Sequence, residues 1–437
     1  MIGEAFRGGI FHFLSDPKDG LTGCYEFFED GLLVVENGRI AQLGDAEPLV
    51  GELDASVRIH EYAGKIICPG FVDTHVHYPQ LAIIASYGES LLDWLECYAF
   101  DEEIKFDDAD HSLKTANHFL DELLRCGTTT AQVFGTVHPE SVEGFFTAAE
   151  KRDLRMICGK VLMDRNGPIG LLDTPETSYI DSKNLIERWH GRGRLRYAVS
   201  PRFAPTSTPD QLATARQLLC EYPGIHLQTH LSEDKEEINW VKSLFPECKN
   251  YLDVYERAGL LGKRSTFAHC LHLTEADWGI LQDTGCSVAF CPSSNLFLGS
   301  GLFDLPRLQF ANVKVGIGTD VGAGTSLSML QTIADAYKTQ RLAGNDLSPL
   351  SGLYMATLGG AQSLDCDADI GNFKIGKEAD FTVLDPESTP LMSYRMQNCK
   401  SLEERLAVIV LLGDDRAISA TYASGHCVHY RDIGEES

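Results

Sequence analysis

The chain has 437 residues, with 63 acidic and 37 basic side chains, a formal net charge of −26 and a sequence pI near 4.9. Such an acidic protein repels phosphate backbones and anionic lipid headgroups, which disfavours general binding to nucleic acids or membrane surfaces. The hydrophobic share of 43% and the charged share of 23% are ordinary for a folded protein and argue against extended disorder.

The cysteines and the termini indicate the compartment. Thirteen cysteines at irregular spacings, with no Cys-x-x-Cys pair, indicate reduced and mostly buried thiols rather than a disulfide scaffold. No apolar run approaches the roughly 18 residues of a membrane-spanning helix. The first residues lack the basic and then apolar pattern of a secretory signal. We therefore expect a soluble, cytoplasmic protein.

The two ends of the chain are rich in strand patterns. Apolar runs at 32–35 and 40–43 flank Asn37-Gly38, which is typical of a two-residue hairpin turn. Residues 380–384 and 420–430 are also strand-like. Because neither end has enough strands for its own core, we expect one small β-sandwich domain built from both termini, residues 1–66 and 371–437.

Between these ends, short β-branched runs alternate with helical patterns, as parallel βα units do. Eight such runs predict a (β/α)8 TIM barrel over residues 67–370, an α/β fold. The alternative is a doubly wound sheet, which usually carries a glycine-rich phosphate loop after its first strand, whereas this chain has His75-Val76-His77 there. The eight expected strands are residues 66–72, 128–134, 155–162, 195–200, 226–230, 265–270, 287–291 and 313–319.

Helices are expected at 110–125, 139–152, 208–221 and 274–284. Two of them begin with strong signals, since Thr208 precedes a proline and Thr274 precedes a glutamate. The segment 86–110, between the first barrel strand and its helix, is long and carries aromatic residues. We expect it to cover the mouth of the barrel.

Polar residues at the carboxyl ends of barrel strands build the active site of this fold. His75 and His77 alternate along a strand, so both imidazoles point to one face and can chelate a divalent ion. His230 and Asp320 follow two later strands and complete a metal-ligand set. Three imidazoles and one carboxylate suit zinc best, although iron binds similar sets. The strand ends carry, in order, His75, His77, Arg202, His230, Glu233, His269, Asn295 and Asp320.

Each ligand has a plainer interpretation when it is taken alone. His230 can be a core histidine bonded to a carbonyl, and Asp320 can cap the helix that follows. Four such residues at successive strand ends favour the metal site. A second metal would need a bridging lysine at the end of the fourth strand, and residues 199–205 contain none. Because Lys160 on the third strand is better interpreted as structural, we expect one metal per chain.

Several motifs resemble the amidohydrolase superfamily over essentially the whole chain. They are the run Pro-Gly-Phe-Val-Asp-Thr-His-Val-His at 69–77, Thr-His at 229–230, Ala-His-Cys at 268–270 and Gly-Thr-Asp at 318–320. Residues 370–373 and 376–380 also resemble the segment that leads the chain of that superfamily back into its β-domain. Longer stretches are similar to the guanine deaminase family within it. These stretches are 77–80, 127–130, 163–166, 200–206, 229–233, 290–296 and 298–301.

The resemblance implies a function and a set of residues. A zinc-activated hydroxide would attack the amino-bearing ring carbon of guanine, releasing ammonia and xanthine, and the enzyme would be a homodimer with one zinc per chain. The implied metal ligands are His75, His77, His230 and Asp320. The implied catalytic residues are Glu233, His269 and Asp320. The implied substrate contacts are His77, Gln80, Arg202, Phe203, His230, Glu233 and Asp320.

The implied roles have alternatives in the sequence itself. Glu233 would carry the proton from water to a purine nitrogen, or it is one solvated carboxylate in the acidic run 233–237. His269 would orient the attacking water, or it is a buried structural histidine. Arg202 would donate to the purine, or it pairs with a barrel carboxylate.

Two rival functions follow from the same pattern. One is a sister hydrolase acting on another amino- or chloro-substituted ring, such as a triazine or another purine. The other is a non-catalytic relative that keeps the barrel as a scaffold. Loss of metal ligands would mark a scaffold, and this chain retains all four together with Glu233.

Overall fold

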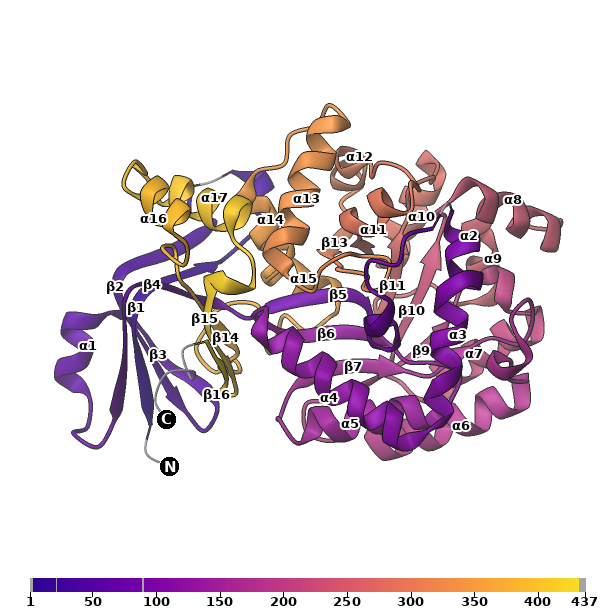
Figure 1. The fold of residues 1–437 in the computed structure, drawn as a ribbon, viewed down its shortest axis with the longest axis horizontal. Coiled ribbons are helices and arrows are strands. Elements are labelled where there is room, and N and C mark those ends of the chain that lie inside the picture. The colour runs from indigo at the N-terminus through magenta and orange to yellow at the C-terminus, as the bar shows by residue number, and fades with distance from the viewer. Residues whose placement is uncertain (1–2, 21, 89, 432–437) are drawn as a thin grey trace.

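The computed structural model describes residues 3–20, 22–88 and 90–431 (Figure 1). A barrel of parallel strands surrounded by helices lies beside a second sheet, to which both ends of the chain contribute. The predicted fold class is therefore confirmed. Residues 1–2 and 432–437 of the expected terminal domain lie outside the described residues.

The second sheet has seven strands in the order β16-β15-β14-β4-β1-β2-β3. Strands β1 and β4 are parallel, and the other neighbours are antiparallel. Asn37 and Gly38 have φ angles of 52° and 75°, the left-handed turn that the hairpin prediction requires. The strands are β1 (Glu4–Phe13), β2 (Tyr25–Glu36), β3 (Arg39–Asp45), β4 (Arg58–Pro69), β14 (Phe381–Leu384), β15 (Ile418–Ala423) and β16 (His426–Tyr430).

An aromatic cluster joins the two ends of the chain inside this sheet. Phe381 and Tyr422, from the C-terminal strands, stack with ring centres 4.5 Å apart. Phe6 of β1 meets both rings edge-on at 4.8 and 4.9 Å. Since all three side chains are buried, this core exists only when the N- and C-terminal strands are together.

The barrel strands follow one another in the order β5-β6-β7-β9-β10-β11-β12-β13, and β8 pairs with β9. The chain after β13 closes the circle, since Asp320 N donates to His75 O at 2.9 Å and His77 N donates to Val321 O at 2.8 Å. The strands are β5 (Phe71–His77), β6 (Thr128–Phe134), β7 (Arg155–Gly159), β8 (Val161–Leu162), β9 (Arg196–Pro201), β10 (His226–Leu231), β11 (Ser265–His269), β12 (Ser287–Phe290) and β13 (Lys314–Ile317).

The first predicted barrel strand, 66–72, is wrong in its bounds. Residues up to Pro69 belong to β4 of the second sheet, and the barrel strand β5 starts at Phe71. The two strands meet at Gly70, where an added Cβ would lie 2.2 Å from Thr129 Oγ1. Because the end of β4 and the start of β5 are both buried and mostly apolar, hydrophobic pattern alone does not separate them.

Helices surround the barrel, and the four predicted ones are present. Thr208 and Thr274 cap α7 and α10, each accepting a bond from a backbone N–H three residues ahead. The barrel helices are α4 (Ala109–Arg125), α5 (Pro139–Glu150), α6 (Pro175–Trp189), α7 (Pro209–Glu221), α8 (Lys235–Leu244), α9 (Tyr251–Ala258), α10 (Glu275–Thr284), α11 (Pro292–Phe297), α12 (Leu305–Phe310), α13 (Met329–Leu342), α14 (Pro349–Met355) and α15 (Leu358–Ser363). Helices α1 (Ala46–Glu52), α16 (Pro390–Met396) and α17 (Leu402–Leu412) accompany the second sheet.

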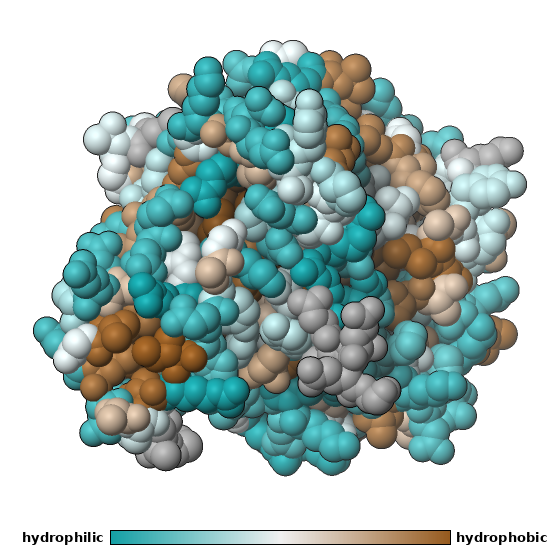
Figure 2. Space-filling view, turned by 60° about the vertical axis from the view of Figure 1, so that its left-hand side comes forward, coloured by the Kyte–Doolittle hydropathy of each residue, from teal (hydrophilic) through white to brown (hydrophobic). Residues whose placement is uncertain are grey.

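The hydropathy of the surface agrees with the charged composition, and the helices agree with the lack of a long apolar run in the sequence. Hydrophilic side chains predominate on the face shown in Figure 2, with separate hydrophobic patches between them. Within the described residues, every helix is too short or too polar to cross a bilayer.

The segment before α4 forms a cover of short helices. It comprises α2 (Leu91–Trp94), a π-helical turn η3 (Leu95–Ala99), α3 (Phe100–Glu103) and a 3-10 turn η4 (Ile104–Asp107). Leu91, Trp94 and Leu95 line the same cavity as residues at the barrel strand ends, which confirms the expectation that this segment covers the mouth.

Candidate active site

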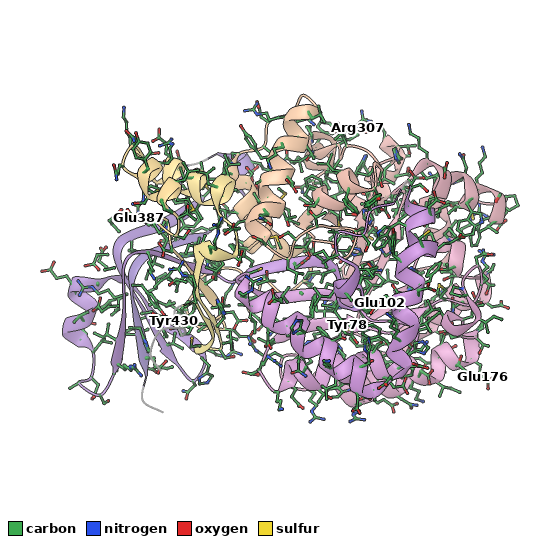
Figure 3. The ribbon with its side chains drawn as sticks, in the orientation of Figure 1. Tyr78, Glu102, Glu176, Arg307, Glu387 and Tyr430 are labelled. Carbon is green, nitrogen blue, oxygen red and sulfur yellow. The ribbon has the colours of Figure 1, made fainter. Side chains whose placement is uncertain are left out.

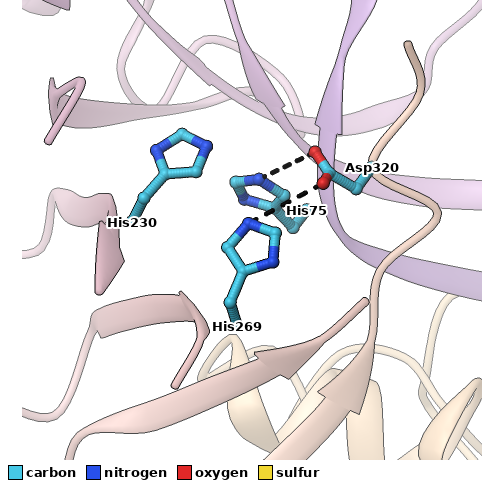
Figure 4. A group of neighbouring side chains, drawn as sticks. All are labelled: His75, His230, His269 and Asp320. Atoms are coloured by element: carbon cyan, nitrogen blue, oxygen red, sulfur yellow. Dashed lines mark ion pairs between the residues drawn. The ribbon is translucent and has the colours of Figure 1, made fainter. Parts of the chain in front are cut away.

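Three imidazoles and one carboxylate converge at the mouth of the barrel (Figure 4). Each of His75, His230, His269 and Asp320 offers one ligand atom, and these four atoms lie within 4.8 Å of one another. Asp320 Oδ1 is 3.2 Å from His75 Nε2, and Asp320 Oδ2 is 3.7 Å from His269 Nε2. The group therefore has the composition and the size of a metal site.

His77 lies at the edge of the same group. Its Nε2 is 3.2 Å from His230 Nε2 and 3.6 Å from Asp320 Oδ1. Ligands bound tetrahedrally at ~2.0–2.1 Å lie roughly 3.3 Å from one another, which matches these spacings. The four ligands predicted from the sequence and His269 thus lie together at the mouth of the barrel.

The hydrogen bonds of two histidines turn their lone pairs into the site. His230 Nδ1 lies 2.6 Å from the carbonyl oxygen of Arg202, and His269 Nδ1 lies 2.9 Å from Asn295 Oδ1. Because each Nδ1 donates to an oxygen, the Nε2 atom of each neutral ring is left as an acceptor. Buried Nε2 atoms of His75 and His269 make no hydrogen bond within the described structure. A bound cation would satisfy these nitrogens.

Burial favours the neutral form of three imidazoles, those of His77, His230 and His269. It lowers the pKa of His77 and of His230 well below the usual value, with neighbouring histidines acting in the same direction. It also lowers the pKa of His269 to about 4. Burial raises the pKa of Asp320, but the adjacent imidazoles outweigh it and hold that pKa below its usual value. Neutral imidazoles and an ionised carboxylate are the forms that bind metals.

Asp73 positions two of the ligand-bearing segments from beneath. Its Oδ1 accepts bonds from His75 N at 3.1 Å and from Thr319 N at 3.0 Å, and its Oδ2 accepts the Thr319 hydroxyl. Burial raises the pKa of Asp73 to about 6. Asp320 and His269 have left-handed φ angles of 51° and 70°, which non-glycine residues adopt rarely and which aim both side chains into the site.

Glu233 is buried beside these ligands. It follows β10 and precedes α8, its exposed fraction is 3%, and its Oε2 is 3.4 Å from His269 Nε2. The sequence left open a solvated helix start, but the helix begins at Lys235 and its exposed acid is Glu236. Burial, followed by the nearby charge of Asp320, raises the pKa of Glu233 well above its usual value.

A cavity lies beside the imidazoles and Asp320 and is lined by Gln80, Arg202 and Phe203. It is also lined by Leu298, Ala323 and the three covering residues named above. The space open to the centres of water molecules there is small, about 30 Å³. The predicted substrate contacts therefore share one cavity with Glu233 and the metal group.

Arg202 also has a partner that the sequence did not identify. Arg202 Nη1 donates to Glu103 Oε2 at 2.5 Å, and Gln80 Nε2 donates to Glu103 Oε1 at 2.8 Å. The guanidinium thus lines the cavity and pairs with a carboxylate at the same time. No motif marked Glu103, because it lies in the covering segment, far from both partners in sequence. Lys160, in turn, pairs with Asp173 and lies outside the ligand group.

The sequence pattern of the amidohydrolase family matches residues 66–428. The chain is 51% identical to the guanine deaminase of Escherichia coli (strain K12) over 432 residues, which cover 98% of each chain. A solved structure of the E. coli guanine deaminase matches with a TM-score of 0.96 at 50% identity, covering 98% of this chain and 100% of that chain. A guanine deaminase from C. acetobutylicum, solved with guanine in its active site, matches with a TM-score of 0.89 at 28% identity, covering 98% and 100%.

Proposed function

This chain belongs to the amidohydrolase family, and we propose that it hydrolyses guanine to xanthine and ammonia. One observation carries the proposal: a single cavity gathers the imidazole–carboxylate group, a buried glutamate, and the side chains Gln80 and Arg202. The full-length similarity to guanine deaminases supports guanine as the substrate.

We propose that one zinc ion per chain is held by His75, His77, His230 and Asp320. The spacings of these ligands and the lowered pKa values of His77 and His230 support this assignment. When bound, zinc lowers the pKa of a coordinated water towards ~7 and so supplies a nucleophile at neutral pH.

Glu233 and His269 supply the proton chemistry in this proposal. Because its pKa is raised, the Glu233 carboxylate is a stronger base than an exposed glutamate and can take a proton from the attacking water. It then passes the proton to the ring nitrogen beside the amino-bearing carbon. His269 Nε2, 3.4 Å from Glu233, orients the water. The hydroxyl proton of the resulting adduct passes through Glu233 to the amino group. The carbon–nitrogen bond then breaks, ammonia leaves, and the new carbon–oxygen bond becomes the carbonyl of xanthine.

Gln80, Arg202 and Phe203 recognise the purine in this proposal. The remaining N–H donors of Arg202 and Gln80 face the acceptors of the base, its six-position carbonyl among them. Phe203 lies beside the flat ring. His77, His230, Glu233 and Asp320 surround the reacting carbon and complete the substrate contacts.

We also propose a cytoplasmic homodimer, as the resemblance to the family implies. The irregular cysteine spacing, with no Cys-x-x-Cys pair, supports a reducing compartment. Light scattering on the purified protein measures the oligomeric state directly.

The decisive test is incubation of the metal-loaded protein with guanine and, separately, with adenine. Guanine is expected to yield xanthine and ammonia. Adenine presents an amino group where guanine has its carbonyl and would leave donors of the site unpaired, and a site built on a required hydrogen bond rejects such analogues by as much as 10⁴–10⁵. Equal turnover of both bases, or activity on a triazine alone, would refute the proposal.

A further inference from the structure

Glu103 joins the two side chains that line the purine end of the cavity. It lies on α3 of the covering segment, and its exposed fraction is 1%. One carboxylate oxygen accepts from Gln80 Nε2 at 2.8 Å, and the other accepts from Arg202 Nη1 at 2.5 Å. A residue of the cover thus contacts side chains presented after β5 and after β9.

Glu103 determines how the Gln80 amide is oriented. An ionised carboxylate only accepts hydrogen bonds, so the Gln80 NH₂ must face it. On the other side of the amide, Gly322 N donates to Gln80 Oε1 at 3.2 Å. Reversing the amide would place donor against donor and acceptor against acceptor. The group that Gln80 presents to a ligand is therefore fixed before the ligand binds.

Glu103 also balances the charge of the cavity wall. The Arg202 side chain is 3% exposed and lies over the Phe100 ring at 5.4 Å, so water stabilises its charge very little. The Glu103 carboxylate neutralises it at close range. Guanine is uncharged at neutral pH, and a balanced pair presents it with N–H donors without demanding a negative charge in return.

We propose that Glu103 is a positioning and specificity residue of the purine site. It fixes the donors of Gln80 and Arg202 and sets the cavity to accept a neutral purine rather than an anionic one. This inference rests on the proposed guanine deamination.

The neighbouring residue provides a matched control. Glu102 is a buried carboxylate of the same helix, labelled in Figure 3, and it pairs with Lys105 at 2.5 Å and with His111 at 4.0 Å. None of the bonds described for Glu102 reaches Gln80 or Arg202. Glu102→Gln therefore removes a similar charge from the same segment and leaves the purine site intact.

The experiment compares Glu103→Gln with Glu102→Gln in the metal-loaded enzyme. We measure KM and kcat for guanine, and the inhibition constant Ki of xanthine in alkaline buffer, where xanthine carries a negative charge. In Glu103→Gln, KM is expected to rise at least about tenfold, with a smaller change in kcat, because an unpaired buried guanidinium weakens neutral-base binding. The ratio of KM for guanine to Ki for xanthine is expected to rise by about tenfold or more, because the unpaired guanidinium attracts the xanthine anion.

A role limited to folding predicts another pattern. General loosening of the cavity would weaken guanine and xanthine together and leave the ratio of KM to Ki unchanged, and that result would overturn the proposal. Kinetics equal to those of Glu102→Gln would overturn it as well. If wild-type protein does not deaminate guanine, the proposed function fails first, and this outcome is distinct from a normal wild type with an unaltered variant.

A second variant separates charge from position. Glu103→Asp keeps the negative charge but shortens the side chain by one methylene, so it cannot reach both partners at their present distances. We expect KM to rise while the ratio of KM to Ki stays at the wild-type value. An unchanged KM in Glu103→Asp would remove the positioning role even if Glu103→Gln were unstable.

Discussion

Two groups of buried ionisable side chains lie at opposite ends of the barrel strands, and they differ in how completely they are paired. At the strand starts, the junction cluster joins the barrel to the second sheet. It consists of the buried side chains of Arg155, Arg194, Glu378 and Asp380, with the partly exposed Asp369 at its edge. Arg155 donates to both Glu378 oxygens at 2.6 and 2.9 Å, and Arg194 donates to Asp380 at 2.7 Å. Burial raises the pKa of Glu378, yet the two arginines hold it below its usual value.

At the strand ends, the active-site group is buried to the same degree but incompletely bonded. The Nε2 atoms of His75 and His269 have no hydrogen-bond partner within the described structure, and those of His77 and His230 face each other at 3.2 Å. Buried polar atoms are normally paired, so unpaired ones mark a place where something else binds. Completeness of pairing, more than burial or charge, therefore separates the structural cluster from the functional one.

Removing a ligand of the active-site group gives the largest expected effect. His75→Ala and Asp320→Ala are expected to lose both bound metal and measurable deamination, because either change opens the proposed ligand set. Elemental analysis and an ammonia assay measure the two losses. His118→Ala, at an exposed histidine of α4, serves as the control and is expected to keep both. Two tightly bound ions per wild-type chain would contradict the single-metal site.

Glu233→Gln is expected to give the next largest effect. The amide keeps the size of the carboxyl but cannot take up and release a proton as a carboxylate does. Turnover is therefore expected to fall by the ~10²–10⁴ that general acid–base groups supply, with metal content unchanged. The matched control is Glu236→Gln, at an exposed position of the same acidic run. Equal turnover in the two variants would return Glu233 to a structural role.

Much of the fold follows from local pattern. Alternation of apolar runs with capped helices predicted the barrel, and Asn37-Gly38 predicted the hairpin, because each depends on residues close in sequence. The first barrel strand was misplaced because β4 and β5 form one apolar run divided only by Gly70, whose close approach to Thr129 is a tertiary contact.

The candidate site was predicted to the extent that strand ends define it. His75, His77, His230 and Asp320 all follow that rule, and the structure brings them together with His269 and Glu233. Glu103 does not follow it, since it reaches the site from a covering segment 99 residues before Arg202. The Arg202 side chain was expected either to meet the ligand or to pair with a carboxylate, and its placement allows both.

Breaking the junction cluster tests the other half of the comparison. Arg155→Met leaves Glu378 with less compensation, and removing one partner of a buried ion pair costs about 3–5 kcal/mol. We expect the free energy of unfolding in urea to fall by that amount while kcat for guanine at low temperature stays near wild type. Arg7→Met, in the exposed pair with Asp30, is the control and is expected to leave the free energy of unfolding near the wild-type value, because solvent screens that pair. A large loss of kcat in a folded Arg155→Met would show that the two clusters are not independent.

The smallest expected effect contrasts two histidines of one strand, since β10 carries His230 at the site and His226 at its start. His226 is buried, its Nε2 lies 3.0 Å from the Leu364 carbonyl oxygen, and burial lowers its pKa to about 4. A pKa below the unfolded value near 6.5 means that the unfolded chain binds the extra proton, so stability is retained above pH 6.5 and lost as pH falls towards 4. The full shift corresponds to roughly 3 kcal/mol.

The test is urea unfolding of His226→Gln, a side chain that keeps a donor near Leu364 but does not titrate. Between pH 6.5 and 4 this variant is expected to lose less stability than the wild type. His118→Gln, at an exposed histidine, is the control. Identical pH profiles for wild type and His226→Gln would contradict the prediction. They would mean that the folded protein tolerates a protonated His226 at the start of β10.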